Sequence, residues 1–536
     1  MATFAVHYKK MNDMDFSRKL PIGIQDFESL RQDGFLYVDK TAYLYRIVNE
    51  GRPYFLGRPR RFGKSLFLST LKAYFQGKKE LFEGLAIADL EKDWVEYPVF
   101  HLDLNLGSYA QFSDLEHVLN VQLTRLESQW GKEDSEGTFS TRLEGLMYRA
   151  HEKTGKRVVV LIDEYDKPLT STLDKPELHE KIREALSGFY GVLKTADPYL
   201  RFLLLTGITK FSKVSIFSQL NQLQDISMSK YFAGVCGISE TELIANFEPE
   251  INSLAKDLNL SYEEMLAELK KRYDGYHFCE NTEGIYNPFS LLNTFSSAAL
   301  RYYWFSTGTP TFLVKMLKEA NFDIPDLESD VTIAAPAIAD YRAGDTNPLP
   351  LLYQTGYLTI KDFDQLFNEY RLGFPNEEVK YGFLDELQRI YSPVAQQNSG
   401  FIASSFVKDL MAANVDGFMT RLRAFFADIP NDLSNKSEKD YQTSFYLLFK
   451  LMGQFVQTEV KSAVGRADMV VWLKDTIYVF EFKLAENATA EEALAQIDDK
   501  GYLIPYSADG RKVVKIGAEF SRAERTLSRW VREDMA

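Results

Sequence analysis

Cysteine, histidine and net basic charge are all scarce in this chain of 536 residues. Its only two cysteines, Cys236 and Cys279, lie far apart without a CxxC pair or a nearby histidine, which excludes a disulfide scaffold and a zinc finger. The six histidines form no HxH or HxxxH pattern that would indicate a metal site. Because 62 Lys and Arg face 76 Asp and Glu, the formal charge is −14. This balance excludes a protein coated in positive charge, such as a non-specific DNA packager, but not a local basic groove.

Membrane and targeting segments are absent as well. No run of about 18 apolar residues occurs, so we expect no membrane helix. The N-terminal sequence MATFAVHYKKMNDMDFSRKL lacks an apolar h-region, so we expect no signal peptide and a cytoplasmic location. The chain does have an ordinary globular composition, 45% hydrophobic and 26% charged, over a length that predicts about three domains.

Residues 18–230 alternate short apolar segments with amphipathic helical patterns. Near-continuous apolar segments separated by helices are typical of a parallel, doubly wound sheet, with strands expected at Tyr54–Leu56, Val99–Leu104, Val158–Ile162 and Phe202–Leu205. Between 231 and 395 the strand signal fades. Helical patterns such as Glu240–Phe247 and Tyr262–Tyr273 predict a helical lid and middle domain there.

A new α+β pattern covers residues 400–536, after the polar loop Ser392–Gly400 that we take as the domain boundary. Its expected elements are a helix in Tyr441–Met452, strands at Val456–Lys461, Ala467–Leu473 and Ile477–Lys483, a helix at Glu491–Asp499 and a strand at Lys512–Ile516. The last segment, SRAERTLSRWVRE, has arginines at helical spacing. We expect a helix whose basic face either follows phosphates or is a solvated surface, formed by Arg522, Arg525, Arg529 and Arg532.

The segment YFLGRPRRFGKS reads as a strand, a loop and the start of a helix, an order that aims backbone N–H groups and a helix N-terminus at an anion. We expect Lys64 to reach phosphates and the Ser65 hydroxyl to ligate Mg²⁺. Gly57 stands one residue early for the usual phosphate loop. Five cations crowd this stretch of an acidic chain, which favours an anion site, though one or two solvated arginines would also fit: Arg52, Arg58, Arg60, Arg61 and Lys64.

The segment RVVVLIDEYDKPL supplies a buried strand that ends in acids. We expect Asp163 to hold Mg²⁺ and Glu164 to polarise the attacking water; the alternative is a solvated acidic turn. A further strand, RFLLLTGITKF, ends in Thr206, read either as a polar sensor beside the γ-phosphate or as a buried threonine capping a turn. The predicted nucleotide contacts are Gly57, Arg60, Arg61, Phe62, Gly63, Lys64, Ser65, Asp163 and Thr206.

These motifs, together with LPIGIQDFESLR, GFLYVDKTAYLYRIV, TGITKFSKVSIFSQLNQLQDIS and YDGYHF, resemble the predicted AAA-ATPase-like family of bacteria over about residues 18–300. The resemblance implies a P-loop ATPase that uses ATP and Mg²⁺, and it makes the displaced Gly57 a family trait. ATPases of this class often take an arginine from a neighbouring subunit, so a homo-oligomer is one expectation. The roles carried over are Lys64 and Ser65 for nucleotide and magnesium, and Asp163 and Glu164 for hydrolysis.

Acids and a lysine also gather in EVKSAVGRADMVVWLKDTIYVFEFK. Along a strand Glu481 and Lys483 share one face while Phe482 turns to the core. Two carboxylates, Asp468 and Glu481, beside a lysine suit phosphodiester hydrolysis, because they provide oxygen ligands for Mg²⁺ and a cation that orients water. Glu459 is the expected further ligand. The alternative for Glu481 and Lys483 is a surface ion pair.

With EEALAQIDDKGYLIPY and KVVKIGAEFS, this stretch resembles the PD-(D/E)XK nuclease superfamily over about residues 400–533. The resemblance implies a restriction-endonuclease-like fold in which Asp468, Glu481 and Lys483 are catalytic and Gln496 supports the site. The upstream acid matches Glu459. Some members of this superfamily bind without cleaving. The alternative that this domain binds but does not cleave therefore stays open.

We therefore predict an α/β multidomain protein: a P-loop ATPase at 18–230, a helical lid and middle domain at 231–395 and a nuclease-like domain at 400–536. The expected activity is ATP-regulated, Mg²⁺-dependent cleavage of nucleic acid, with DNA as the expected partner and RNA as the open alternative. One alternative is a nucleotide-switched binding or signalling ATPase whose second domain only grips nucleic acid or protein. Another is a mobile-element or defence component that acts only on foreign or modified DNA.

Overall fold

The chain forms two compact units in a computed structural model, an N-terminal unit of Met1–Phe322 with Glu328–Val379 and a C-terminal unit of Asp323–Leu327 with Lys380–Ala536. The predicted boundaries at 230 and 395 stay predictions, and 392–398 lies outside the described residues. The structure describes residues 18–51, 53–210, 223–305, 313, 316–317, 320, 322, 324–328, 331–338, 347–391, 399–428, 438–454, 457–460, 468–506 and 509–535.

A five-stranded parallel sheet is the centre of the N-terminal unit, with strand order β2-β3-β4-β1-β5. Its strands are β1 (Pro53–Gly57), β2 (Val99–Asp103), β3 (Val158–Asp163), β4 (Leu200–Gly207) and β5 (Gln224–Asp225). All six residues of β3 are buried, as expected for a strand covered on both faces. The four predicted strands and their parallel arrangement are confirmed.

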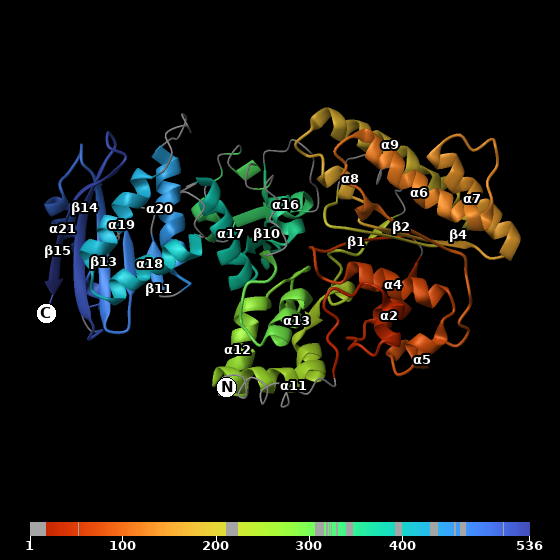
Figure 1. Ribbon diagram of the computed structural model, residues 1–536, viewed down its shortest axis with the longest axis horizontal. Helices are drawn as coiled ribbons and strands as arrows, with labels where there is room; N and C mark the ends of the chain where they lie inside the picture. The colour runs from red at the N-terminus through yellow and green to blue at the C-terminus, as the bar shows by residue number, and fades with distance from the viewer. Residues whose placement is uncertain are drawn as a thin grey trace, which may run out of the picture. The chain divides into compact units, whose positions relative to one another are not determined.

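Helices cover both faces of this sheet, so the doubly wound arrangement is confirmed as well (Figure 1). On one face lie α2 (Phe27–Gln32), α4 (Lys64–Phe75) and α5 (Ala86–Leu90). On the other lie α6 (Phe112–Trp130), α7 (Phe139–Thr154), α8 (Lys167–Thr170) and α9 (Pro176–Thr195). Helix α3 (Thr41–Glu50) contacts α5.

A helical subdomain follows the sheet. It contains β6 (Ile238–Ser239), α11 (Glu240–Leu258), α12 (Tyr262–Tyr273), β7 (Ile285–Tyr286) and α13 (Pro288–Ser297). Ser239 and Ser261 begin α11 and α12 with capping boxes completed by Glu242 and Glu264. Both predicted helices are confirmed, and α12 has the predicted bounds.

The prediction that 231–395 is helical is wrong in part, because three of its segments form an antiparallel sheet. In the last of these strands buried Tyr370 and Leu372 alternate with exposed Arg371, a period-two pattern too short to stand out in the sequence. The elements here are β8 (Val331–Ala334), α15 (Ala335–Ile338), α16 (Leu349–Thr355), β9 (Thr359–Asp364), β10 (Glu369–Gly373) and α17 (Glu377–Tyr391).

The C-terminal unit is built on a mixed sheet of order β11-β12-β13-β14-β15, in which only β13 and β14 are parallel. Phe480 of the central strand meets Phe418 on one face, and Val479 packs with Ile497 on the other. The predicted elements up to β14 are confirmed. The elements are α18 (Ser399–Met411), α19 (Val415–Ala427), α20 (Glu438–Met452), β11 (Gln457–Val460), β12 (Met469–Trp472), β13 (Thr476–Leu484), α21 (Ala490–Asp499), β14 (Lys512–Ser521) and β15 (Thr526–Met535).

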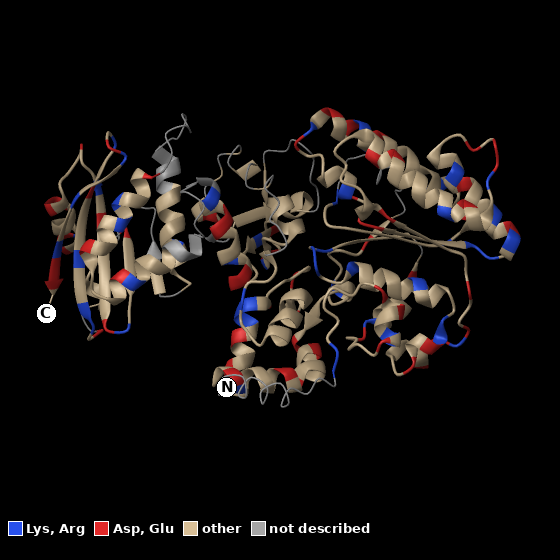
Figure 2. Ribbon diagram, viewed as in Figure 1, with Lys and Arg blue, Asp and Glu red and all other residues tan. Residues whose placement is uncertain are grey.

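The predicted C-terminal helix is wrong, because Thr526–Met535 is strand β15, antiparallel to β14. Side chains three positions apart on a strand, such as Arg529 and Arg532, point to opposite faces, so the arginines form no single stripe. Basic and acidic residues are interspersed over the described helices of each unit (Figure 2). Among those helices none is both long and apolar enough to cross a membrane.

Candidate functional site

The loop between β1 and α4 presents a helix N-terminus to an open pocket. Gly63 precedes the helix with φ 95°, a left-handed conformation that glycine adopts without a steric penalty. The first helical hydrogen bond runs from the Phe67 N–H to the Gly63 carbonyl, 3.0 Å. The N–H groups of Lys64, Ser65 and Leu66 therefore have no acceptor within the helix, which is the arrangement that suits an anion.

Lys64 is buried at the base of this loop. Its ammonium donates to the carbonyls of Arg58 at 3.0 Å and Pro59 at 3.2 Å. The Glu164 carboxylate lies 3.7 Å from the same ammonium, because both residues follow the carboxyl ends of parallel strands, β1 and β3, at the same edge of the sheet. The two carbonyls take two of the three ammonium donors and Glu164 lies beyond hydrogen-bond distance, so within the described residues one donor is left for an anionic ligand.

Acids gather where β2 and β3 end. Asp163 closes β3 opposite Asp103 of β2, and the Thr206 hydroxyl of β4 donates to the Asp163 carboxylate. Burial raises the pKa of Asp103, and the negative charges of Asp163 and Glu164 add to the shift. Burial, followed by repulsion from Glu164, raises the pKa of Asp166 to about 7. This end of the sheet therefore concentrates carboxylates next to the Lys64 loop.

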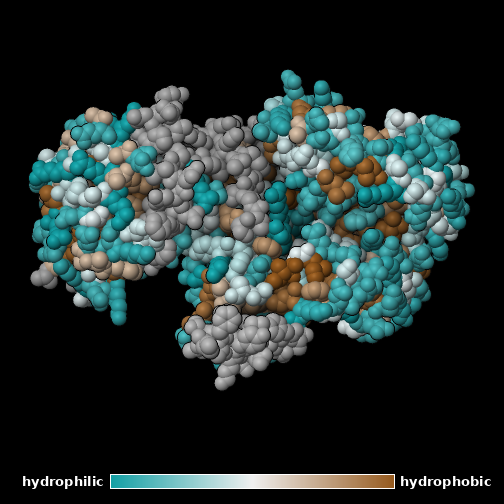
Figure 3. Space-filling view, in the orientation of Figure 1, coloured by the Kyte–Doolittle hydropathy of each residue, from teal (hydrophilic) through white to brown (hydrophobic). Residues whose placement is uncertain are grey.

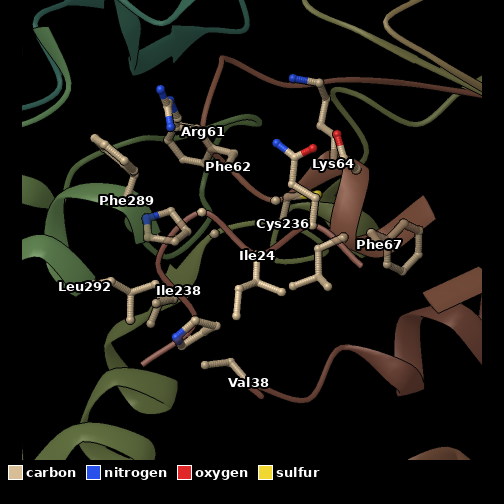
Figure 4. Close-up of a pocket in the computed structure, with 18 of the residues that line it drawn as sticks. Ile24, Val38, Arg61, Phe62, Lys64, Phe67, Cys236, Ile238, Phe289 and Leu292 are labelled. Atoms are coloured by element: carbon tan, nitrogen blue, oxygen red, sulfur yellow. The ribbon is translucent and has the colours of Figure 1, made fainter. Parts of the chain in front are cut away.

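A pocket of about 430 Å³ opens between the loop that joins β1 to α4, the N-terminal residues 21–40 and the helical subdomain. One wall is polar and includes Lys64, Ser65 and Glu164. Figure 4 shows apolar side chains away from Lys64, and Figure 3 shows hydrophobic surface gathered between α13 and α4. The apolar lining includes Ile22, Ile24, Leu36, Val38, Ile238, Phe289 and Leu292. A ligand with an anionic end and a flat apolar end fits such a division.

The structure distributes the predicted nucleotide contacts over three places. Asp163 and Thr206 are buried and hydrogen-bonded to each other at the strand ends. Gly57 lines a second, smaller cavity and its N–H donates to the Ser227 hydroxyl at 2.8 Å. Those lining the large pocket are Arg60, Arg61, Phe62, Gly63, Lys64 and Ser65.

Arg58 does not belong with the cations that face the large pocket. Its buried guanidinium donates to the carbonyls of Ser227 at 2.7 Å and Phe232 at 2.9 Å and lies 4.1 Å from the centre of the Phe278 ring. Burial lowers its pKa. Arg58 therefore holds the segment after β5 against the loop, which the interpretation of all five cations as one anion site did not foresee.

Two further cations of the pocket escaped the sequence analysis. Lys40 donates to the Glu242 carboxylate at 2.6 Å and to the Gly234 carbonyl, so it joins the N-terminal segment to α11. Lys167 begins α8 and lines the pocket with Glu164. The signal available for Lys167 was its place just after the acids in IDEYDKPL.

The second site lies at the centre of the C-terminal sheet. Asp468 comes directly before β12 and accepts a 2.8 Å hydrogen bond from the Phe482 N–H of β13. Glu481 is 2% exposed, and its Oε1 atom accepts from Lys483 at 3.0 Å and from Gln496 of α21. Four predicted residues thus meet at one place, and the expected shared face of Glu481 and Lys483 is confirmed.

The charge balance of this site favours a cation. Burial raises the pKa of Asp468 to about 6, with a further contribution from the Glu481 carboxylate, and burial also raises the pKa of Glu481. Oε2 of Glu481 is buried and has no hydrogen-bond partner among the described residues. The described residues contain no group of three or more His, Cys, Asp or Glu placed to hold a metal. Glu459 lies on β11 opposite Val470, and its side chain is outside the described residues.

Helix α21, which carries Gln496, is fixed to β14 at both ends. The Glu519 carboxylate accepts from the Ala490 N–H at 2.7 Å, and Lys515 donates to Asp498 at 2.7 Å. Between them Gly517 lets the helix approach, since a Cβ there would lie 2.2 Å from the Ala490 carbonyl oxygen. Gln496 is thereby held over Glu481.

The fold and the two sites define a multidomain α/β protein with a parallel-sheet unit and a mixed-sheet unit. Residues 21–217 match the family described as Predicted AAA-ATPase, and residues 436–530 match the PD-(D/E)XK nuclease superfamily. A protein of Azotobacter chroococcum mcd 1, described as "Uncharacterized protein in vnfD 5'region", is 39% identical over 528 residues, which are 97% of this chain and 99% of that protein. The chain belongs to the predicted AAA-ATPase-like family and carries a C-terminal PD-(D/E)XK nuclease superfamily domain, as the motifs indicated.

Proposed function

We infer that this protein binds and hydrolyses ATP in its N-terminal unit and cleaves nucleic acid in its C-terminal unit. The observation that carries the first activity is the approach of Lys64 to Glu164, 3.7 Å, on the polar wall of a pocket whose other wall is apolar. Phosphates fit the N–H groups that begin α4, and the base fits the apolar lining.

The residues of the pocket and of the neighbouring strand ends have distinct roles in this proposal. Lys64 neutralises the phosphates, while Ser65 and Asp163 provide the oxygen atoms that suit Mg²⁺. When bound, Mg²⁺ would offset phosphate charge and orient the terminal phosphate. Glu164 accepts a proton from the attacking water. Thr206 holds the Asp163 carboxylate in place through its hydroxyl.

The nuclease proposal rests on Oε2 of Glu481, a buried carboxylate oxygen beside Asp468 for which the described part of the chain provides no hydrogen-bond partner. Two hard oxygen donors with raised pKa values fit Mg²⁺, which would supply a water of lowered pKa when bound. Lys483 orients that water or stabilises the phosphate charge, and Gln496 fixes the Glu481 carboxylate. Nucleic acid, with DNA as the expected substrate, is the partner.

Two measurements on the full chain test both activities. ATP hydrolysis should be lost in Lys64→Ala, and Mg²⁺-dependent nicking of plasmid DNA should be lost in Asp468→Ala and in Lys483→Ala. Regulation by ATP is inferred from the fusion of the two domains, and it predicts that Lys64→Ala also cleaves DNA more slowly in the presence of ATP. Undiminished cleavage by that variant would remove the regulatory link. DNA binding without cleavage by the wild type would instead support a nucleotide-switched binding protein.

A further inference from the structure

Lys167 occupies the polar wall of the pocket next to the residues proposed to act on the phosphates. It is the first residue of α8, and its N–H donates to the Glu164 carbonyl at 2.9 Å. The following Pro168 and Leu169 are buried, which fixes the start of this short helix. The backbones of Lys167 and Glu164 are therefore joined by a hydrogen bond. Both side chains line the pocket together with Lys64.

Within the part of the chain that is described, the Lys167 ammonium makes no salt bridge, and the Glu164 and Asp166 carboxylates attract it only over a longer distance. No hydrogen bond or ion pair of its side chain, or of the Arg60 side chain beside it, occurs there. Burial lowers the pKa of Lys167 and repulsion from the Arg60 guanidinium lowers it further, while the charges of Glu164 and Asp166 oppose part of this shift. Two cations that face one cavity and repel each other are stabilised by an anion placed between them.

Lys40 shows what a purely structural lysine looks like in the same pocket. Its ammonium is fully engaged by the Glu242 carboxylate at 2.6 Å and the Gly234 carbonyl at 2.8 Å. Lys40 thus connects two parts of the fold and has little left for a ligand. Among the described residues Lys167 makes no such connection, so its ammonium can contact an anion that enters the polar end of the pocket.

We propose that Lys167 is a catalytic residue that contacts the terminal phosphate of ATP from within the same chain. The inference rests on the proposed ATPase function. Hydrolysis forms a bond from the water oxygen to the γ-phosphorus and breaks the bond to the β,γ-bridging oxygen, whose electron pair leaves with ADP. The water proton passes to Glu164. Lys167 and Arg60 stabilise the negative charge on the phosphoryl oxygens, as an arginine finger supplied in cis does.

The test compares Lys167→Met with Lys167→Arg and with Lys181→Met, an exposed lysine of α9 outside the pocket. For Lys167→Met we expect a fall in kcat of about 10²–10³-fold with ADP affinity within about twofold of the wild type. Lys167→Arg should recover much of the rate, and Lys181→Met should match the wild type. The wild-type rate per molecule should stay constant on dilution, because no neighbouring subunit is required.

Each other result has a separate meaning. An unchanged kcat in Lys167→Met, or an equal loss of ADP and ATP affinity, overturns the inference while leaving the ATPase proposal intact. A rate per molecule that falls on dilution shows that the cation comes from another subunit. If the wild type binds nucleotide without hydrolysis, the ratio of affinities for a non-hydrolysable ATP analogue and ADP must fall in Lys167→Met. Failure of the wild type to bind either nucleotide overturns the proposed function itself.

Discussion

The Lys64 ammonium lies 3.7 Å from the Glu164 carboxylate, so the residue proposed to hold the phosphates and the residue proposed to activate water are within reach of each other. The two arrive from separate strands, at the start of α4 and after β3. Each therefore affects the electrostatic environment of the other, and removing the charge of one changes what the other can bind.

Glu164→Gln should separate nucleotide binding from hydrolysis. We expect kcat for ATP to fall about 10²–10⁴-fold, because the proton acceptor is lost. Affinity for ATP should be unchanged or higher, because Lys64 loses a competing carboxylate. Phosphate release and fluorescent nucleotide titration measure the two effects, with Glu184→Gln, at an exposed position of α9, as the control. Equal rates in the variant and the wild type would rule out Glu164 as the base.

Asp468→Asn should stabilise the C-terminal unit and at the same time weaken metal binding. Since the folded-state pKa of Asp468 is raised to about 6 from 3.8, ionisation at neutral pH opposes folding by on the order of 3 kcal/mol. Asparagine keeps an acceptor for the Phe482 N–H without the charge. The Tm should rise in EDTA, and Mg²⁺ should raise the Tm of the wild type but not of the variant. A variant that Mg²⁺ stabilises as much as the wild type would contradict the assignment of Asp468 as a ligand.

Gly517→Ala should impair the second site from a distance. The added methyl would lie 2.2 Å from the Ala490 carbonyl oxygen and 2.5 Å from the Leu494 nitrogen, so α21 must move away from β14. Gln496 would move with the helix and lose its bond to Glu481. We expect a lower Tm for the C-terminal unit and weaker cleavage at unchanged ATP hydrolysis. Gly188→Ala, in α9 with open space around it, is the control and should be neutral or stabilising.

Glu378→Gln should change how stability depends on pH. This buried carboxylate accepts from the N–H groups of Tyr303 and Trp304 and from the Ser290 hydroxyl, and burial raises its pKa from 4.5 to about 7. A raised acid pKa means that the folded protein holds the proton more tightly than the unfolded chain, so stability falls as pH rises from about 4.5 to 7. Glutamine removes this contribution. Tm measured across that range should be flatter in the variant, and an identical slope would show that Glu378 does not titrate there.

The parallel sheet was predictable because buried strands such as Val158–Ile162 carry their signal in a continuous apolar run. Strand β10 was not predictable, because its alternation of buried and exposed residues spans only a few positions between helical patterns. β15 was read as a helix because arginines at spacings of three and four imitate one helical face. The segment forms a strand because it pairs with β14, and this contact between segments outweighs the local helical spacing.

The sites show the same division between local and distant information. Lys64 and Glu481 could be found because a few consecutive residues carry the chemistry. Arg58 was grouped with the cations of the predicted anion site because its sequence neighbours are basic. In the folded chain its guanidinium is buried and donates to carbonyls more than a hundred residues away. The apolar wall of the pocket likewise comes from segments that meet only in the folded chain.

Glu164 has φ 52°, in the left-handed region that costs a non-glycine residue on the order of 1 kcal/mol. Its N–H donates to the Asp163 carboxylate at 3.1 Å, which helps hold this turn. Asparagine enters that region more readily than glutamate, so Glu164→Asn is expected to fold at least as well as the wild type. At this position selection for thermal stability and selection for turnover would favour different residues, and a stabilised variant recovered by screening for Tm alone would be expected to have lost the reaction.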